Sequence, residues 1–302
     1  MRGEETVRPI RTGRIVWILV LLAGLPLQAL ATSGSNGGAG GGSSLMLNSA
    51  LSVDAADDRD AQLGANWAVS AATTLSFLSE YTSSPADRTD LVTHTLGLGV
   101  DQQFTSSLGG GLFYQHWGKP GDIMSNSYYA NLYWQNTAWQ VTVLPGFRRI
   151  TLNTRSNPFV SIKLPNNVEF DDRRLGLRID YTGLDNWLFE ASTTRHDYTR
   201  NPSVLNRRTA LLFFTGSALT LSQGFLSHSS TFRVERDFGL TSLAMDYEID
   251  RSAIDGTYAY TTDLDFETPI SERFDMEIIT GVTHAAHTPR TGFITFNLVY
   301  YR

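Results

Sequence analysis

The stretch Tyr258–Glu267, which reads YAYTTDLDFE, alternates between large apolar or aromatic residues and small or acidic residues. Leu264 and Phe266 fall on one side of this alternation, and Asp263 and Asp265 fall on the other. Because successive side chains of a β-strand point to opposite faces of the sheet, one face should be apolar and the other charged. The stretch therefore predicts a strand that separates two different environments.

The same two-residue period recurs along the chain from Leu45 onward, whereas a helical period of 3.6 residues is almost absent. The clearest further segments are 63–69, 96–100, 128–135, 174–181, 243–250, 274–278 and 294–300. The chain is therefore predicted to be all-β. Since a soluble β-sandwich alternates in the same way, the period alone leaves two architectures open.

Charged and aromatic residues favour a transmembrane barrel over a sandwich. The polar faces carry many charged and small residues, as a wet interior tolerates, and aromatic residues recur near the expected strand ends, as membrane interfaces require. The candidates for these aromatic girdles are Trp67, Tyr81, Trp117, Trp134, Trp139, Trp187, Tyr198, Tyr258 and Tyr300. A bilayer supplies no hydrogen-bond partners to the backbone, so consecutive hairpins must close into a ring. We predict a transmembrane, antiparallel up-and-down β-barrel.

The connections between the expected strands alternate in length. Short ones fall at 70–72, 136–137, 183–186, 237–239 and 269–271, and longer polar ones fall at 83–90, 153–169, 200–206 and 284–291. Short periplasmic turns opposite longer external loops are typical of outer-membrane barrels. If both ends are periplasmic the strand number is even. We expect sixteen strands, with twelve or fourteen as alternatives, and the segment 207–237 is the weakest part of that assignment.

The N-terminal residues 1–31 have the pattern of a secretory signal peptide that is cleaved. Arginines at positions 2, 8, 11 and 14 precede an apolar run from Ile15 to Leu22, and the small-x-small triplet Ala29–Ala31 follows. The run is shorter than the roughly 20 residues of a membrane-spanning helix. Residues 32–44 form a Gly/Ser-rich leader, so residues 45–302 are expected to be one barrel domain. The chain has no cysteine, which excludes disulfides and a lipid-modified N-terminus.

The C-terminal segment Gly292–Arg302 reads GFITFNLVYYR, a glycine followed by alternating apolar residues and an aromatic pair. It resembles the C-terminal assembly signal of bacterial outer-membrane β-barrel proteins, although Arg302 follows the aromatic pair. This resemblance is to the broad class and to no narrower family. It implies a location in the bacterial outer membrane, with outer-membrane lipids and the barrel assembly machinery as partners.

Charged residues segregate along the chain, with basic residues between Arg148 and Arg208 and acidic residues between Asp246 and Glu277. Neighbours in sequence are neighbours in the wall of an up-and-down barrel, so we expect a basic and an acidic sector that face the lumen. The basic candidates are Arg148, Arg149, Arg174, Arg178 and Arg195, and the acidic ones are Asp246, Glu248, Asp263, Asp265, Asp275 and Glu277.

These sectors are compatible with two functions. Opposed charged walls create a field that orients polar solutes, which favours a channel or exporter that passes small polar solutes or polysaccharide by diffusion. If the charges pair across the interior instead, the barrel is closed and serves as a surface interaction or anchoring protein. The strand number, which sets the width of the lumen, decides between them.

A weaker hypothesis is a lipid-modifying hydrolase. His228 and Ser230 share a strand face, and they resemble the His-x-Ser pair of outer-membrane phospholipases and lipid A deacylases, with Thr231 where an asparagine usually follows. A chance match of two residues is common, so we do not expect an enzyme. We expect no cofactor and no metal site, since His284 and His287 lack a third ligand. The acidic pI of about 5.5 argues against a nucleic-acid partner, and the oligomeric state is not indicated.

Overall fold

The computed structural model describes residues 44–55, 57–84, 91–121, 123–153, 167–205, 225–285 and 290–302. The predicted signal peptide and all but the last residue of the predicted leader lie outside these residues. So does most of segment 207–237, the part assigned with least support. In the part of the chain that the structure describes, no helix is long and apolar enough to cross a bilayer.

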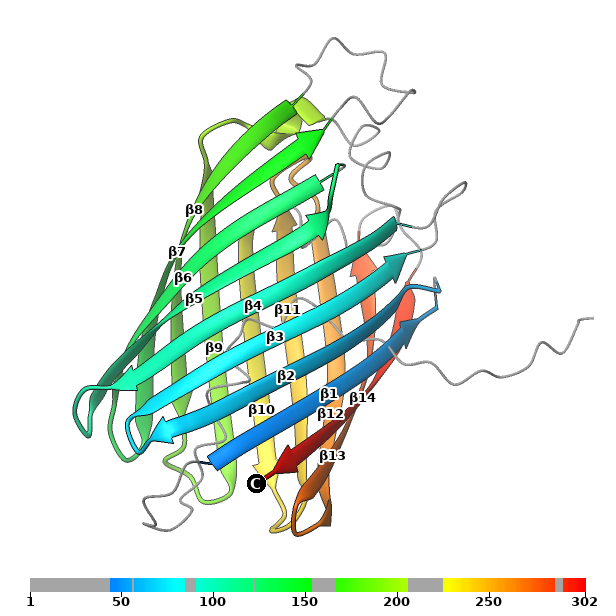
Figure 1. The fold of residues 1–302 in the computed structure, drawn as a ribbon. Helices are drawn as coiled ribbons and strands as arrows, with labels where there is room; N and C mark the ends of the chain where they lie inside the picture. Colours follow the sequence, from blue (N-terminus) through cyan, green and yellow to red (C-terminus); the bar gives the residue numbers. More distant parts are fainter. Residues whose placement is uncertain are drawn as a thin grey trace, which may run out of the picture.

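Fourteen antiparallel strands make up the described chain, in sequence order around a closed ring (Figure 1). Their bounds are β1 Ser44–Asp54, β2 Arg59–Ser70, β3 Thr73–Ser84, β4 Leu91–Gln103, β5 Leu108–Lys119, β6 Ile123–Gln135, β7 Trp139–Asn153, β8 Asn167–Tyr181, β9 Trp187–Tyr198, β10 Leu226–Asp237, β11 Ser242–Ser252, β12 Tyr258–Ser271, β13 Phe274–Ala285 and β14 Thr291–Tyr301. A short 3-10 helix, η2, spans Pro202–Leu205.

The ring closes where the first strand pairs with the last. β1 and β14 run antiparallel, with partners from Met46 opposite Tyr301 to Asp54 opposite Phe293. The prediction of an antiparallel up-and-down barrel is confirmed, but the preferred count of sixteen strands is wrong and the alternative of fourteen is right. A count of sixteen requires strands of about 9–11 residues, the length that spans a bilayer. The strands of the structure are 11 to 15 residues long, so the same chain forms fewer of them.

The two ends of the barrel differ. At the end we call the short-turn end, residues 71–72, 104–107, 136–138, 182–186, 238–241 and 272–273 connect strands, and the barrel's first and last residues meet there, with the Leu45 amide donating to the Arg302 carbonyl at 3.1 Å. The opposite, long-loop end carries the connections 154–166 and 199–225. Figure 1 shows the short-turn end at the bottom. Four of the five predicted short turns are confirmed, and the fifth lies slightly later because β12 continues to Ser271.

The strands are apolar outside and polar inside, the reverse of a soluble fold. On β12, Leu264 and Phe266 point outward and are exposed, whereas Asp263 and Asp265 point inward and are buried. The whole barrel repeats this arrangement: the exposed residues include many Leu, Phe, Val and Trp side chains, and the buried ones include many Asp, Ser and Thr side chains. An apolar exterior of this extent is stable only in contact with lipid.

The interior also holds an apolar cluster near the long-loop end, which we call the interior apolar cluster. Its members are Ile123, Ile150, Leu152, Val168, Phe170, Phe225 and Ile254, with Trp117, Tyr198 and Ala253 packed against them. The ring centroids of Phe170 and Phe225 are 5.1 Å apart in an edge-on arrangement. Trp117 and Tyr198 therefore pack inside the barrel, and their assignment to a membrane girdle is wrong.

Candidate functional site

The charged side chains of the lumen come mainly from β7 to β13, the wall that begins with the green strands of Figure 1 and continues round the back. Directly opposed residues of neighbouring strands point to the same face. One row of five directly opposed, inward charged residues can therefore be followed from strand to strand. The row runs Asp180, Glu190, Arg233, Asp246, Asp263 across β8 to β12. Four acids and one arginine make this row strongly acidic.

Arg233 is the hub of the acidic side. Its guanidinium forms ion pairs with Asp246 at 2.7 Å, with Asp265 at 2.8 Å and with Glu235 at 3.0 Å. Its side chain is 23% exposed, so it keeps contact with the open interior. The planar guanidinium presents five N–H donors, which suits one cation to three carboxylates from three strands. Arg233 therefore joins β10, β11 and β12 through the lumen.

Two smaller ion-pair groups lie on β7, β8 and β9. Arg178 binds Asp180 at 2.7 Å and Glu190 at 3.0 Å, and these side chains are largely buried. Asp172 accepts from Arg148 at 3.1 Å and contacts the Nδ1 atom of His196 at 2.9 Å. Each arginine here faces at least one carboxylate, so this part of the wall is close to neutral.

Arg174 differs from the other inward arginines. Its guanidinium lies over the ring of Tyr129, 3.5 Å from the centroid, in a cation–π contact between β8 and β6. Among the described residues no carboxylate forms an ion pair with it. Its positive charge therefore lies on the inward face beside an aromatic ring instead of a carboxylate.

The acidic wall itself holds more carboxylates than its arginine can pair. In the described chain, the ion pairs leave Glu248, Asp250 and Asp263 without an arginine, and Glu277 accepts a hydrogen bond from the Asn297 amide. One carboxylate oxygen of Asp250 and one of Asp265, the Oδ1 atom in each case, have no protein hydrogen-bond donor. A buried carboxyl of this kind is stable only if it is protonated or has water or a cation beside it. The acidic wall therefore has more carboxyl groups than the arginines beside it can pair.

The structure places the predicted lumen residues as follows. Arg148, Arg174 and Arg178 and all six acidic candidates, Asp246, Glu248, Asp263, Asp265, Asp275 and Glu277, lie on the inward face. Arg149 and Arg195 lie on the outward face, since they follow or precede inward residues by one position; Arg149 binds Asp171 at 2.7 Å and is half exposed. The prediction missed Arg233, Glu190, Asp60 and Glu80, which point inward. Extending the alternation through β2, β3, β9 and β10 would have found them.

Aromatic residues mark the two ends of the apolar exterior. Trp67, Trp134, Trp139, Trp187 and Tyr300 point outward near the short-turn end, and Tyr81 and Tyr258 point outward near the long-loop end. An even-stranded closed barrel with short turns at one end, an apolar outer band and aromatic girdles has the design of outer-membrane proteins. This chain has the fold of a bacterial outer-membrane β-barrel. In proteins of this design the short-turn end faces the periplasm and the long-loop end faces the outside, and the two ends are called periplasmic and external below.

No protein-family model matches the chain, and no curated protein matches it. Solved structures of similar shape include OmpT with loop L8 deleted, an outer membrane protein of Vibrio cholerae, at 12% identity and a TM-score of 0.45 over 86% of this chain and 98% of that one. OccK11 (OpdR) of Pseudomonas aeruginosa is 10% identical with a TM-score of 0.43, over 86% of this chain and 95% of that one. The KdgM porin in complex with disordered oligogalacturonate is 8% identical with a TM-score of 0.41, over 84% and 98%. Similarity this low carries no argument about the solute of this barrel.

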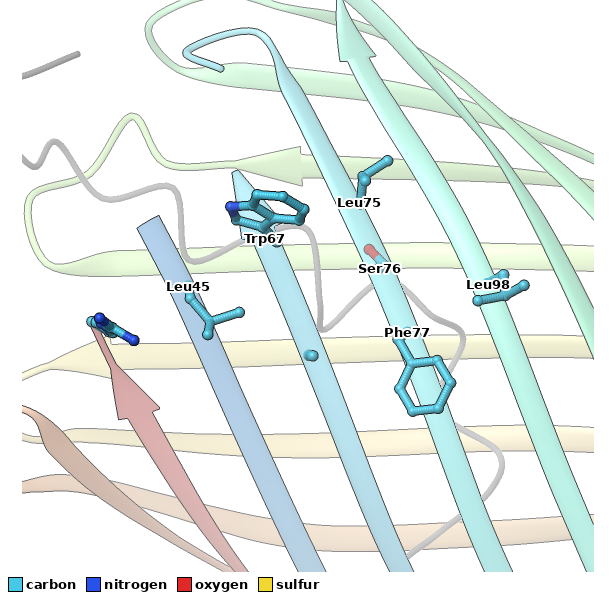
Figure 2. Close-up of a pocket in the computed structure, with 8 residues that line it drawn as sticks. Leu45, Trp67, Leu75, Ser76, Phe77 and Leu98 are labelled. Atoms are coloured by element: carbon cyan, nitrogen blue, oxygen red, sulfur yellow. The ribbon is translucent and has the colours of Figure 1, made fainter. Parts of the chain in front are cut away.

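A groove of about 680 Å³ lies on the outer surface near the periplasmic end. Figure 2 shows the side chains of Trp67, Leu75, Phe77 and Leu98 on adjacent strands, with Leu45 at the edge of the groove. Arg302 also lines the groove. These apolar side chains are exposed on the lipid-facing side of the wall. The groove therefore suits acyl chains of the bilayer and is not a site for a polar solute.

The pair His228 and Ser230 also lies outside the barrel, on β10. The His228 Nε2 atom is 3.0 Å from the Ser230 hydroxyl, which is 3.1 Å from the Thr193 hydroxyl of β9. The direct cross-strand neighbours of His228 are two arginines, Arg195 and Arg251. In a hydrolase the catalytic histidine is oriented by an acidic partner. Among the described residues, the hydrogen-bond partners of the His228 ring are the hydroxyls of Ser230 and Thr193, and no carboxylate contacts it. The hydrogen-bonded pair forms, but it lacks the third group of such a catalytic site.

Proposed function

We propose that the protein is a passive channel that passes small polar solutes by diffusion and favours cations over anions. The observation that supports this proposal is the excess of inward carboxylates on β8 to β13 over inward arginines, with the row from Asp180 to Asp263 as its centre. Fixed negative charges concentrate cations in a narrow aqueous passage and exclude anions. An acidic polysaccharide is therefore a poor solute for this lumen, and a neutral or cationic small molecule is a better one.

Ion selectivity in planar bilayers tests the proposal. In a KCl gradient the reversal potential of the purified protein should have the sign of a cation-selective pore. Glu248→Gln with Asp263→Asn removes two lumen charges and leaves the Arg233 ion pairs in place. We expect the K⁺/Cl⁻ permeability ratio to fall about sevenfold per charge, because a Coulomb interaction of ~0.6 kcal/mol at about 7 Å in water favours K⁺ about threefold and disfavours Cl⁻ by about the same factor.

The matched control removes two acids from the outward face, Glu169→Gln with Asp197→Asn. This variant has the same net charge as the lumen variant but an unchanged interior, so its permeability ratio should equal that of the parent. Equal effects of the two double variants would contradict a role for the lumen charges. Anion selectivity of the parent would contradict the proposal itself.

A closed barrel that serves as a surface interaction or anchoring protein is the second candidate. The interior apolar cluster favours it, because apolar side chains from β6, β7 and β8 and from two connections meet inside the wall near the external end. A narrow apolar zone excludes water and ions. Absence of any conductance from correctly folded protein would favour this candidate over the channel.

A further inference from the structure

A row of cationic and aromatic side chains lies on the outer surface near the external end, which we call the outer basic row. It consists of Arg195 on β9, His228 on β10, Arg251 on β11 and Tyr258 on β12, each the direct cross-strand partner of the next. Directly opposed residues have Cβ atoms about 4.5–5.5 Å apart. All four side chains are exposed on the lipid-facing side. This row therefore groups two guanidinium groups around one imidazole.

Such a row is unfavourable in isolation, because like charges directly opposite each other destabilise a sheet and arginine is costly on a lipid-facing wall. Two other outward arginines near this end face acids: Arg149 binds Asp171, and Arg173 lies directly opposite Asp197. Within the described residues, no carboxylate forms an ion pair with Arg195 or Arg251. The outer basic row thus brings together two arginines whose charge no described carboxylate neutralises.

The row lies close to the level of the lipid headgroups. On β10 it is eight residues from Arg236, which stacks on Trp187 and Phe238 at the periplasmic interface. Eight residues span about 26 Å along a strand, which is roughly 20 Å along the membrane normal at the usual strand tilt of about 35–45°, against roughly 25 Å for the apolar band. Between the two arginine levels, Phe232 and Val234 face lipid. The row therefore lies within about 5 Å of the outer interface, and long arginine side chains can extend over that distance to headgroups of the outer leaflet.

The side chains around the row are rich in hydrogen-bond donors. The hydroxyls of Ser230 and Thr193 lie directly below it and bond to each other and to His228. Arg251 lies over the Tyr258 ring at 5.7 Å, which holds its guanidinium at the surface. Arginine binds phosphate through two parallel N–H donors, and hydroxyls and imidazole N–H groups complete such a site. The chemistry that fits is a phosphate monoester or diester on a lipid.

We propose that the outer basic row binds the phosphorylated sugar headgroup of a glycolipid of the outer leaflet, with its acyl chains against Phe232 and the apolar side chains below. The phosphate replaces the missing acid between Arg195 and Arg251 and neutralises the row. The hydrogen bond between Ser230 and His228 then positions a donor for this phosphate. The assignment is independent of whether the lumen conducts.

Binding of lipid A to the detergent-solubilised full barrel tests the proposal. Two ligands with the same acyl chains are compared, bis-phosphorylated lipid A and its enzymatically dephosphorylated form, by native mass spectrometry or fluorescence titration. We expect the phosphorylated form to bind more tightly, and Arg195→Gln with Arg251→Gln to weaken its binding at least about tenfold, as the loss of charge-assisted hydrogen bonds predicts. Binding of the dephosphorylated form should not change.

The control variant, Arg149→Gln with Arg173→Gln, removes the same charge from outward arginines that already face acids. Its affinity for phosphorylated lipid A should remain close to that of the parent. Equal affinity of the parent for the two lipids would overturn the proposal. So would equal losses in the two double variants, which would indicate general electrostatic attraction, or full displacement of the lipid by millimolar inorganic phosphate, which would indicate a free-anion site. Refolding of each variant is checked by its mobility on gels before and after heating.

Discussion

At the scale of single residues, adjacent positions on one strand have opposite environments. Arg148 lies inside and forms an ion pair with buried Asp172, while Arg149 lies outside and pairs with Asp171 in partial contact with solvent. The same ion-pair chemistry therefore has different energetic weight on the two faces. An exposed pair contributes ~0–1 kcal/mol, whereas removal of one partner from a largely buried group leaves uncompensated charge.

Arg233→Gln should destabilise the barrel more than Arg149→Gln does. The first variant leaves Glu235, Asp246 and Asp265 facing one another without their shared cation. Because Arg233 keeps some solvent contact, we expect a loss on the order of 2 kcal/mol, and a clearly smaller loss for Arg149→Gln, whose ion pair is exposed. The measurement is reversible urea unfolding in detergent micelles. Equal losses would contradict the hub role of Arg233.

We expect Ser230→Ala and the parent protein to release fatty acids from phospholipid vesicles at the same background rate. The reason is that the cross-strand neighbours of His228 are Arg195 and Arg251, so no carboxylate among the described residues orients its ring as acyl transfer requires. The assay follows fatty-acid release over hours with calcium present and absent. Activity in the parent that disappears in the variant would restore the hydrolase hypothesis.

At the scale of elements, the alternation in the sequence predicts strand faces wherever one face is apolar and the other polar. β12 is such a strand, and the faces assigned to Leu264 and Asp263 are those of the structure. On β7 this approach fails, because the inward residues Ile150 and Leu152 are apolar members of the interior apolar cluster while the outward positions Arg149 and Thr151 are polar. The usual polarity of the two faces is therefore reversed near the external end. The position of Arg149 could therefore not be read from β7 alone. Arg195 could have been, since Trp187, Phe189 and Ala191 precede it on its own face.

The hairpin of β5 and β6 depends on a glycine that no other residue replaces easily. Gly118 has a φ of 142°, and a Cβ atom there would lie 2.1 Å from the carbonyl oxygen of Ile123. Gly118→Ala should lower stability by about 2 kcal/mol or more, since backbone must move to relieve the overlap. Gly292→Ala is the matched control, because its nearest atom would be 3.8 Å away. Similar unfolding midpoints for both variants would contradict this argument.

At the scale of the whole molecule, fourteen strands enclose a lumen that is acidic along one wall and apolar near one end. The sequence predicted the closed barrel and the acidic sector, but the strand number depends on strand length, which no local pattern specifies. The interior apolar cluster could not be predicted either. Its residues come from β6 to β8, from Phe225 and from the connection after β11, and only closure of the ring brings them together.

Phe170→Ala should raise single-channel conductance, because it removes one of the two phenyl rings of the interior apolar cluster and opens space beside Phe225. Phe293→Ala, on β14 across the ring in strand order, removes an equally large inward side chain outside the cluster and should change conductance less. Conductance in 1 M KCl compares the variants. A larger increase from Phe293→Ala would place the narrowest part of the lumen elsewhere.

The pairing of β1 with β14 has a consequence for biogenesis. Met46 finds its partner in Tyr301, at the far end of the polypeptide, so the first strand has an unsatisfied edge until the last one has been synthesised and exported. A nascent or proteolytically shortened chain that lacks residues 291–302 leaves the edges of β1 and β13 unpaired. Each unpaired edge can pair with another chain and start aggregation. An unpaired β1 edge thus distinguishes an incomplete chain from a closed barrel.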